Sequence, residues 1–219
     1  MQYIWDVLII ILLFAVFGYT HSVLASEKIK LAFRKSYGNK IAFYRLGYNL
    51  FSLASLYIIY ELSPKPHLNI YDLPNPYDLL ILIPQFLGLA GLLWATKYVC
   101  VQEFLGISQI KRYFNGTYDS GLDEILTLTI GGPYKYSRHP IYFYSIVIIV
   151  FRPTMDLFYL TFTICMIAYF YIGAFYEEKK LMKQFGDTYI KYKESVPKIF
   201  PVKFFHPYLL ENLAEAESD

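Results

Sequence analysis

The sequence has 219 residues, of which 56% are hydrophobic, 20% are aromatic and only 17% are charged, and its formal net charge is +2. Soluble domains usually carry about a quarter charged residues, so this composition is typical of a protein that crosses a membrane several times. No basic stripe or nucleic-acid-binding motif occurs in the sequence, so we expect no nucleic-acid partner.

The first segment, MQYIWDVLIIILLFAVFGYTHSVLAS, approaches the length of about 20 apolar residues that a membrane span needs. Val23, Leu24 and Ala25 resemble a secretory cleavage site. However, the residues before the apolar stretch contain Asp6 and no Lys or Arg, and the stretch is too long for a signal peptide. We therefore predict a retained first span over residues 7–24.

Three further stretches approach membrane length, and they cover residues 42–62, 79–96 and 157–176. A fifth apolar stretch, residues 140–151, is short, but the sequence RPTMD that follows it predicts a tight turn. We therefore expect this stretch to pair with the next span as a helical hairpin. Period-two alternation of apolar residues is absent, which argues against a barrel.

These segments predict an all-α polytopic membrane protein with about five transmembrane helices in one integral-membrane domain, residues 1–219. Within it, residues 1–103 hold three spans, residues 104–201 form the catalytic and cofactor-binding region, and residues 202–219 form a tail. After the last span, the sequence EEKKLMKQFGDTYIKYK places Leu181, Phe185 and Tyr189 at helical spacing. This pattern predicts an amphipathic helix that lies at the membrane interface.

The charges of the connecting loops predict the orientation. The loop between the first two spans, counted to Arg45 at the start of the second, holds six Lys or Arg residues and one acid, whereas the next loop, SPKPHLNIYDLPNPYD, holds one Lys and two Asp. The third loop and the tail are again basic. By the positive-inside rule we expect the N-terminus outside and the C-terminus in the cytoplasm. An even number of spans would place the two most basic segments on opposite sides.

A cluster of polar residues flanks the predicted hairpin. Because both arms of a hairpin return to the same side, the turn at 131–142 should lie near the end of the last span. Ser137 is a candidate N-cap and Pro140 suits a first helical turn, so helix N–H groups should point toward the same place. The residues that we expect to meet there are Tyr134, Arg138, His139, Tyr142, Glu177 and Glu178.

Such a pocket offers donors for an anion, a carboxylate for an ammonium or ribose, and tyrosine faces for a cation. S-adenosylmethionine carries all of the complementary groups: a carboxylate, an ammonium, a ribose and a sulfonium. No metal site is expected. The two cysteines, Cys100 and Cys165, lie far apart and form no CxxC pair, so we interpret them as inert thiols.

The same residues carry a family resemblance. The stretch GPYKYSRHPIY, followed about 35 residues later by EEKKLMKQFGDTYIKYKESVPKIFP, resembles the integral-membrane methyltransferases. That family includes isoprenylcysteine carboxyl methyltransferases, phospholipid methyltransferases and the methanethiol and NnrU-like branch. The resemblance covers residues 104–201. The shorter stretches HSVLAS, YRLGYN, FLGISQ and RPTMD are similar to the methanethiol and NnrU-like branch.

The resemblance implies a cytosolic pocket for S-adenosylmethionine. Residues 126–129 fall on a further cofactor stretch of the family, with different residue types. The isoprenylcysteine enzymes carry an Arg four residues before the Glu pair, where this sequence has Gly173, and this departure argues against a prenylcysteine carboxylate substrate. The positions that match cofactor-contacting residues are Tyr134, His139, Pro140, Ile141, Tyr142 and Glu177, with Glu178 beside them.

Methyl transfer is an in-line displacement whose barrier falls mainly through alignment of the reacting groups. A thiol acceptor must ionise, because the thiolate is the nucleophile. His139 and His21 are candidate bases, although His21 could equally be a helix-end histidine bonded to a carbonyl. Arg138 completes the motif as a third candidate catalytic residue. Gln109 could orient a substrate or be an ordinary polar loop residue.

We therefore predict a membrane methyltransferase that uses S-adenosylmethionine to methylate a small or lipophilic thiol. Two alternatives share the fold and cofactor but methylate an isoprenylcysteine carboxylate or a phospholipid amine. A haem-binding or redox membrane protein is a different class, as is a membrane scaffold or transporter. Haem ligation by two histidines would need a facing pair at membrane depth, and only His21 approaches that position. The sequence leaves the oligomeric state open.

Overall fold

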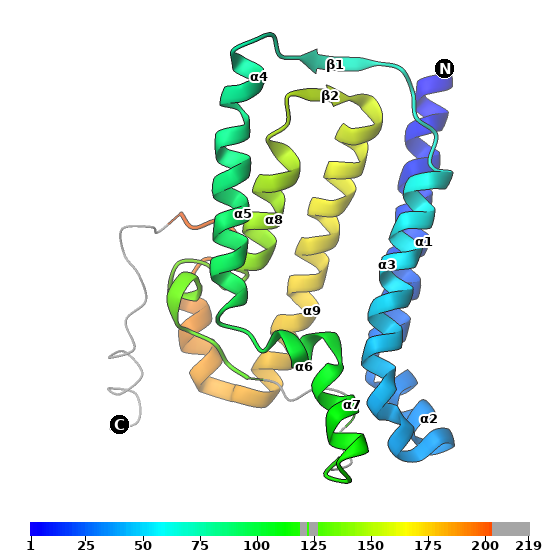
Figure 1. Ribbon diagram of the computed structural model, residues 1–219, viewed down its shortest axis with the longest axis vertical. Helices are drawn as coiled ribbons and strands as arrows, with labels where there is room; N and C mark the ends of the chain where they lie inside the picture. The colour runs from blue at the N-terminus through cyan, green and yellow to red at the C-terminus, as the bar shows by residue number, and fades with distance from the viewer. Residues whose placement is uncertain (119–121, 123–126, 203–219) are drawn as a thin grey trace. The chain divides into compact units, whose positions relative to one another are not determined.

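A computed structural model describes residues 1–118, 122 and 127–202 and is helical through most of its length (Figure 1). The predicted all-α class is therefore confirmed. The helices are α1 (Gln2–Ala25), α2 (Glu27–Tyr37), α3 (Tyr44–Leu62), α4 (Tyr77–Leu80), α5 (Leu82–Thr96), α6 (Val101–Leu105), α7 (Ile107–Phe114), α8 (Pro140–Val150) and α9 (Leu157–Ser195), with the 3-10 turns η1 (Gly38–Phe43) and η2 (Gly132–Lys135).

Three helical segments among the described residues are long and apolar enough to cross a membrane: Gln2–Ala25, Tyr77–Thr96 and Leu157–Ser195. Helix α8 is apolar but has only 11 residues. Helix α3 contains Arg45, Asn49 and Glu61, and it is not among the three. The chain is thus an α-helical membrane protein, and the count of five spans stays a prediction.

The chain divides into two compact units that interleave along the sequence. Unit 1 comprises the described parts of residues 1–68, 100–125 and 157–162, and unit 2 comprises the described parts of residues 69–99, 126–156 and 163–219. In unit 1, α1 packs against α3, and α6 also contacts α3. Every residue of the cluster predicted around His139 belongs to unit 2.

Helices α5 and α8 of unit 2 pack closely because glycines lie at their contact. A Cβ atom at Gly91 would come within 2.2 Å of the Tyr144 ring, and one at Gly88 would come within 3.0 Å of Val147. Small residues of this kind allow two helix backbones to approach in a membrane. The side-chain amide of Gln85 also donates a hydrogen bond of 2.9 Å to the carbonyl of Ile148. This packing holds the middle and the end of α8 against α5.

A short sheet joins the ends of the unit 2 helices. Strand β1 (Asn69–Asp72) pairs antiparallel with β2 (Thr154–Asp156), with Asp72 opposite Thr154, as Figure 1 shows. The interpretation of RPTMD as only a tight turn was therefore wrong, because three of its residues form a strand. The partner strand lies more than 80 residues earlier in the chain, and strands this short leave no local pattern.

Helix α9 extends far beyond its apolar part, residues 157–176, and bends at Gly186. That residue has φ 51° and ψ −130°, a left-handed conformation that favours glycine. The predicted amphipathic helix is thus present, and its place at the membrane interface stays a prediction. Tyr189 and Tyr192 are buried in a core with Ile130 and Val196, so this face packs inside unit 2.

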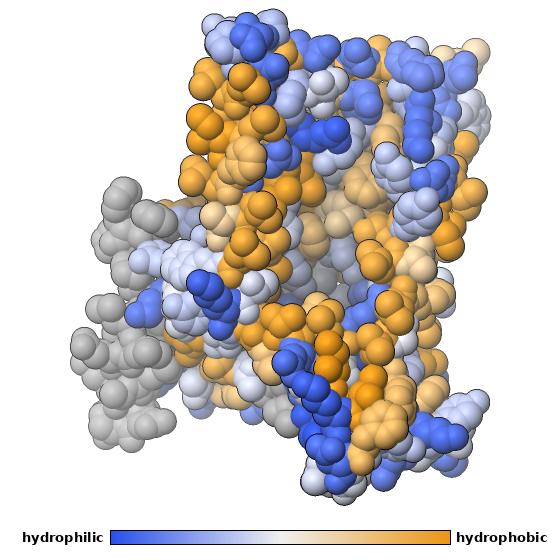
Figure 2. Space-filling view, viewed as in Figure 1, coloured by the Kyte–Doolittle hydropathy of each residue, from blue (hydrophilic) through white to orange (hydrophobic). Residues whose placement is uncertain are grey.

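The surface of α5 is strongly apolar. Figure 2 shows hydrophobic side chains along this helix, and Ile83, Phe86 and Leu87 are among its exposed residues. A contiguous exposed apolar surface marks contact with another apolar phase. On a helix of membrane length, that phase is the lipid bilayer, in agreement with the predicted partner.

Candidate functional site

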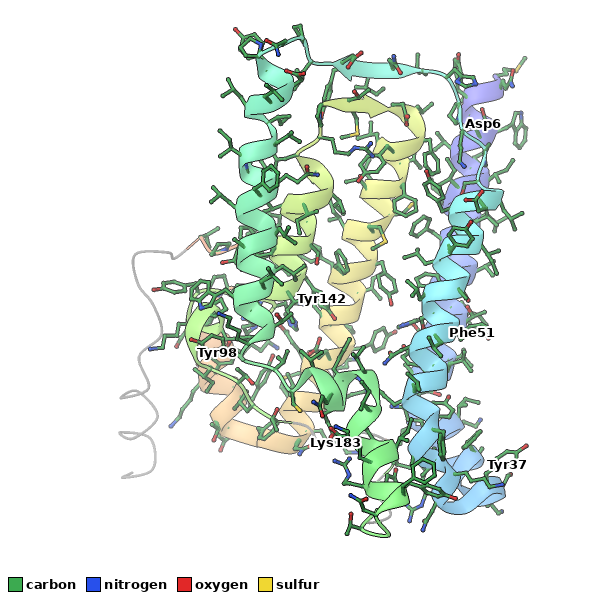
Figure 3. The ribbon with its side chains drawn as sticks, in the orientation of Figure 1. Asp6, Tyr37, Phe51, Tyr98, Tyr142 and Lys183 are labelled. Carbon is green, nitrogen blue, oxygen red and sulfur yellow. The ribbon has the colours of Figure 1, made fainter. Side chains whose placement is uncertain are left out.

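The turn before α8 depends on a glycine. Gly132 has φ +57°, and a Cβ atom there would lie 2.3 Å from the ring of Tyr98, so a larger residue would be both strained and blocked. Figure 3 labels Tyr98 near the end of α5. The next residues form η2, and the hydroxyl of Tyr192 donates a 2.7 Å hydrogen bond to the carbonyl of Tyr134. The turn is therefore fixed from two sides.

Backbone hydrogen bonds tie the residues before α8 to the segment after α9. The N–H of Arg138 donates to the carbonyl of Pro197, and the N–H of His139 donates to that of Lys198, both at 3.0 Å. The Ser137 hydroxyl donates to the carbonyl of Ile199 at 2.7 Å. The entrance of α8 is thus held by the chain that follows the exit of α9, as the hairpin argument requires.

Ser137 does not cap α8, and that prediction was wrong. His139 is the N-cap residue, with no side-chain capping bond, and Pro140 is the first helical residue as expected. The Ser137 hydroxyl instead accepts a hydrogen bond of 3.2 Å from the His139 N–H. It is turned toward the segment after α9, because its own proton goes to a carbonyl there.

His139 is buried between two glutamates of α9. Its Nε2 lies 3.2 Å from Oε1 of Glu178, and its Nδ1 lies 3.5 Å from Oε2 of Glu177. The hydroxyl of Tyr142 donates to the same Glu177 oxygen at 3.1 Å. Burial lowers the pKa of His139, but hydrogen bonds and charges from both glutamates outweigh it and raise this pKa above 6.5.

The two glutamates differ in surroundings. Glu178 is only 3% exposed, accepts a hydrogen bond of 2.9 Å from Nε of Arg138 and forms an ion pair of 2.8 Å with a terminal nitrogen of the same side chain. The side chain of Glu177 is 48% exposed. Burial raises the pKa of Glu178, but His139 and Arg138 lower it to about 2. Glu178 is therefore a buried, neutralised anion, and Glu177 is an accessible one.

Aromatic rings stack beside these carboxylates. The His139 and Tyr142 rings are 5.3 Å apart with an interplanar angle of 7°, and Tyr142 stacks on Phe170 at 5.1 Å and 14°. Figure 3 labels Tyr142 on the part of α8 that lies next to α9. The pKa of Tyr134 is raised by burial and by the charge of Glu177, which places this phenol near the same carboxylate.

The structure thus brings together most of the residues that the sequence predicted. Pro140 is buried and Ile141 follows it in the first turn of α8. Of the further cofactor stretch, residue 126 lies outside the described residues, and the hydroxyl of Thr129 donates to the carbonyl of Tyr98 at 3.2 Å. The predicted residues that meet around Glu177 and Glu178 are Tyr134, Arg138, His139 and Tyr142.

His21 and Gln109 belong to unit 1. The Tyr48 hydroxyl lies 2.6 Å from Nε2 of His21, so a phenol contacts this ring. Gln109 is fully buried, and its amide donates to the carbonyl of Glu103 at 2.9 Å. Both side chains have structural contacts inside their own unit, and their predicted catalytic and substrate-binding roles stay predictions.

Sequence reasoning did not identify Phe170 or the segment 197–199 as parts of the site. Phe170 lies seven residues before Glu177, which is two helical turns on the same face, so helical spacing from the Glu pair could have found it. The segment 197–199 acts through backbone carbonyls. Carbonyls carry no residue-specific signal in the sequence.

Comparison with known proteins found curated relatives along most of the chain. The sequence is 29% identical over 197 residues to methanethiol S-methyltransferase 1 of Bradyrhizobium diazoefficiens, covering 89% of this chain and 67% of that protein. It is 26% identical to methanethiol S-methyltransferases of Crocosphaera subtropica, with 86% and 72% covered, and of Mycobacterium tuberculosis, with 89% and 78% covered. No family model and no solved structure matches. The predicted resemblance is confirmed.

Proposed function

From the premise that this membrane protein is a relative of the methanethiol S-methyltransferases, we propose that it transfers a methyl group from S-adenosylmethionine to a small thiol. The observation that carries the proposal is the half-exposed Glu177, which meets His139 and Tyr142 where α8 begins. The cofactor is cationic at its ammonium and sulfonium groups. A site for it therefore needs an accessible anion beside aromatic faces.

The residues present fit that cofactor. Glu177 supplies a carboxylate that can accept hydrogen bonds from an ammonium or a ribose hydroxyl. The stacked rings of Tyr142 and Phe170 supply faces that attract a sulfonium. The N–H of Ile141, in the first turn of α8, has no helical carbonyl four residues before it, so it suits a carboxylate. Each charged group of the cofactor has a partner of opposite character in one cluster.

When bound, S-adenosylmethionine supplies a methyl group on an electron-poor sulfur. Transfer would form a bond between the acceptor's thiolate sulfur and the methyl carbon as the methyl–sulfonium bond breaks, so the thiolate would lose its negative charge and the sulfonium its positive charge. The protein's part is alignment, and Glu177 with the ring stack would fix the cofactor's orientation. The buried Glu178 and His139 keep Glu177 and the ring stack in place.

The surroundings of Gly173 support a thiol acceptor. Gly173 lies one helical turn before Glu177, and a Cβ atom there would meet only the Tyr142 hydroxyl, at 3.7 Å. A glycine within a helix costs about 1 kcal/mol relative to Ala, and here neither a positive φ nor a close contact requires it. We infer that it leaves room for the acceptor beside Tyr142. No cation stands at this position to pair with an acceptor carboxylate.

The predicted orientation is part of the proposal. The charge pattern of the loops supports an N-terminus outside and a C-terminus in the cytoplasm, where S-adenosylmethionine is available. Cysteine labelling from outside intact cells tests this orientation. Single cysteines are introduced at Asn69, in the loop with few basic residues, and at Lys35, in the basic loop. We expect labelling at Asn69 only.

A methyl-transfer assay with labelled cofactor tests the proposed function. Purified protein in detergent is given methanethiol, larger alkanethiols, a farnesylcysteine analogue or phosphatidylethanolamine. We expect dimethyl sulfide from methanethiol, with rates that fall as the alkyl chain lengthens. Transfer only to the farnesylcysteine carboxylate or only to the lipid amine would show that this group, and not a thiol, is the methyl acceptor. No transfer to any acceptor, together with no cofactor binding, would overturn the proposal.

A further inference from the structure

Arg138 is buried, and its donors are committed to the protein. Its side chain is 7% exposed, and it reaches Glu178 through Nε and through one terminal nitrogen. The other terminal nitrogen donates to the carbonyl of Lys193 at 2.6 Å and also to the carbonyl of Val196. A guanidinium held in this way joins the entrance of α8 to the end of α9, so it has little capacity to contact an acceptor.

The contact with Arg138 has a consequence for His139. The same Glu178 oxygen, Oε1, accepts from Arg138 and lies 3.2 Å from His139 Nε2. With Nε2 engaged there, the other ring nitrogen, Nδ1, faces Glu177 at 3.5 Å. The position of Arg138 therefore sets Glu178, and Glu178 sets the ring that faces the accessible carboxylate.

We propose that Arg138 and Glu178 form a positioning pair that sets the orientation and charge of His139 toward Glu177, and that neither contacts the methyl acceptor. This role rests on the proposed function for its link to catalysis, since Glu177 is the carboxylate offered to the cofactor. It assigns different roles to adjacent residues of the chain. Glu177 binds the cofactor, whereas Glu178 supports the position of His139.

The charged and titratable groups around His139 lie on α8, on α9, on the turn before α8 and on the segment after α9. Glu177 and Glu178 approach from α9, Tyr142 from α8 and Arg138 from the preceding turn. The groups that act on these carboxylates from further away are Lys198, 3.7 Å from Glu178, together with Tyr134, Lys180 and Tyr189. Within this set, Arg138 and Glu178 are the oppositely charged residues that meet at the oxygen facing His139 Nε2.

The two members of the pair therefore act on His139 with opposite signs. Loss of the positive Arg138 leaves the negative charge of Glu178 uncompensated, which favours protonated His139 and raises its pKa. Loss of the negative Glu178 leaves a cation nearby, which disfavours the protonated ring and lowers its pKa. A residue pair with only a structural role would lose stability in both variants without opposite effects on His139.

The experiment is an NMR titration of 13C-histidine-labelled protein in detergent, without cofactor. The sequence contains four histidines, and the signal that disappears in His139→Gln identifies the relevant one. We expect the pH midpoint of the His139 titration to rise in Arg138→Gln and to fall in Glu178→Gln, each by about one pH unit. The double variant should lie between them. Thermal unfolding of each variant is measured alongside.

Arg138→Lys keeps the charge and should restore the midpoint nearly to the wild-type value. If Arg138→Gln does not fold, Lys198→Gln removes a more exposed cation near the same carboxylate, and we expect a smaller upward movement. Midpoints that move in the same direction, or do not move, would overturn the proposal. The titration needs no methyl transfer, so a wild-type protein that fails to bind S-adenosylmethionine would sink the proposed function alone.

Discussion

Two histidines near helix ends, His139 and His21, differ in what surrounds them. His139 is 6% exposed, lies between two carboxylates, and has its backbone bonded to the segment after α9. His21 contacts the Tyr48 hydroxyl and packs against the Phe17 ring at 5.5 Å. The first environment is a buried network of charged side chains, and the second is a pair of aromatic side chains, His21 and Tyr48.

This difference shows that a histidine at a helix end is not sufficient to mark a site. Ionisable groups that are buried together are costly unless each is paired, so such a network indicates a function or a specific structural demand. A histidine paired with a phenol is satisfied at little cost. The account therefore gives His139 a direct place in the cofactor site and His21 none, and the following substitutions test that contrast.

The largest effect is expected for His139→Ala. It removes the ring that packs on Tyr142 and contacts both glutamates, so Glu177 loses a partner that fixes its position. We expect the affinity for S-adenosylmethionine to fall at least about 100-fold, the equivalent of two charge-assisted hydrogen bonds. Calorimetry measures it, with the exposed His67→Ala as a control. Unchanged affinity in a folded His139→Ala protein would remove this residue from the site.

A smaller effect is expected for Tyr142→Phe. The substitution keeps the ring that stacks on Phe170 and removes the hydroxyl that donates to Glu177 at 3.1 Å. One hydrogen bond to a charged group contributes about 1.5–3 kcal/mol, so we expect cofactor affinity to fall about tenfold or more. Tyr171→Phe on α9 is the matched control. Equal affinities in the two variants would show that the hydroxyl does not organise Glu177.

Gly173→Leu should affect the acceptor and spare the cofactor. A leucine would fill the space beside the Tyr142 hydroxyl, so we expect KM for butanethiol to rise about tenfold while methanethiol is less affected. Gly47→Leu in α3 is the control, because a Cβ atom there meets nothing within 4 Å and Gly47 belongs to unit 1, whereas Tyr142 belongs to unit 2. A change in cofactor affinity without a change in acceptor preference would place the cofactor, not the acceptor, beside Gly173.

The smallest effect is expected for His21→Gln. A general base contributes typically about 10²–10⁴ to a rate, whereas we expect kcat with methanethiol to change less than about threefold. The thiolate can form without a protein base, because the pKa of a free thiol, about 8.5, lies close to neutral pH. A loss above 100-fold that is recovered at higher pH would instead make His21 the base that the sequence suggested.

The sequence predicted the membrane class and the meeting of the 131–142 turn with Glu177 and Glu178, because hydropathy and hairpin geometry are local arguments. It did not predict that carbonyls of Pro197, Lys198 and Ile199 hold this turn. Such contacts join segments about 60 residues apart through groups that every residue possesses. The assignment of Ser137 as a cap failed for the same reason, since a distant carbonyl takes its hydroxyl.

The same limit applied to the two glutamates. The hairpin geometry and the family resemblance placed both at the cofactor site, with Glu177 on a matching position and Glu178 beside it, but adjacent residues of a helix point about 100° apart. One is therefore buried against Arg138, and the other is half exposed beside Tyr142. Only the direction of each side chain separates the residue that we propose binds the cofactor from the residue that we propose supports it.

The most direct test of the account is calorimetric titration of S-adenosylmethionine into wild-type protein and into Glu177→Gln, with the exposed Glu194→Gln of α9 as the control. We expect one cofactor per chain for the wild type and for Glu194→Gln, and an affinity at least about 30-fold weaker for Glu177→Gln, which loses a charge-assisted contact. Equal affinity in Glu177→Gln and wild type would contradict the central claim that this carboxylate, held between α8 and α9, binds the cofactor.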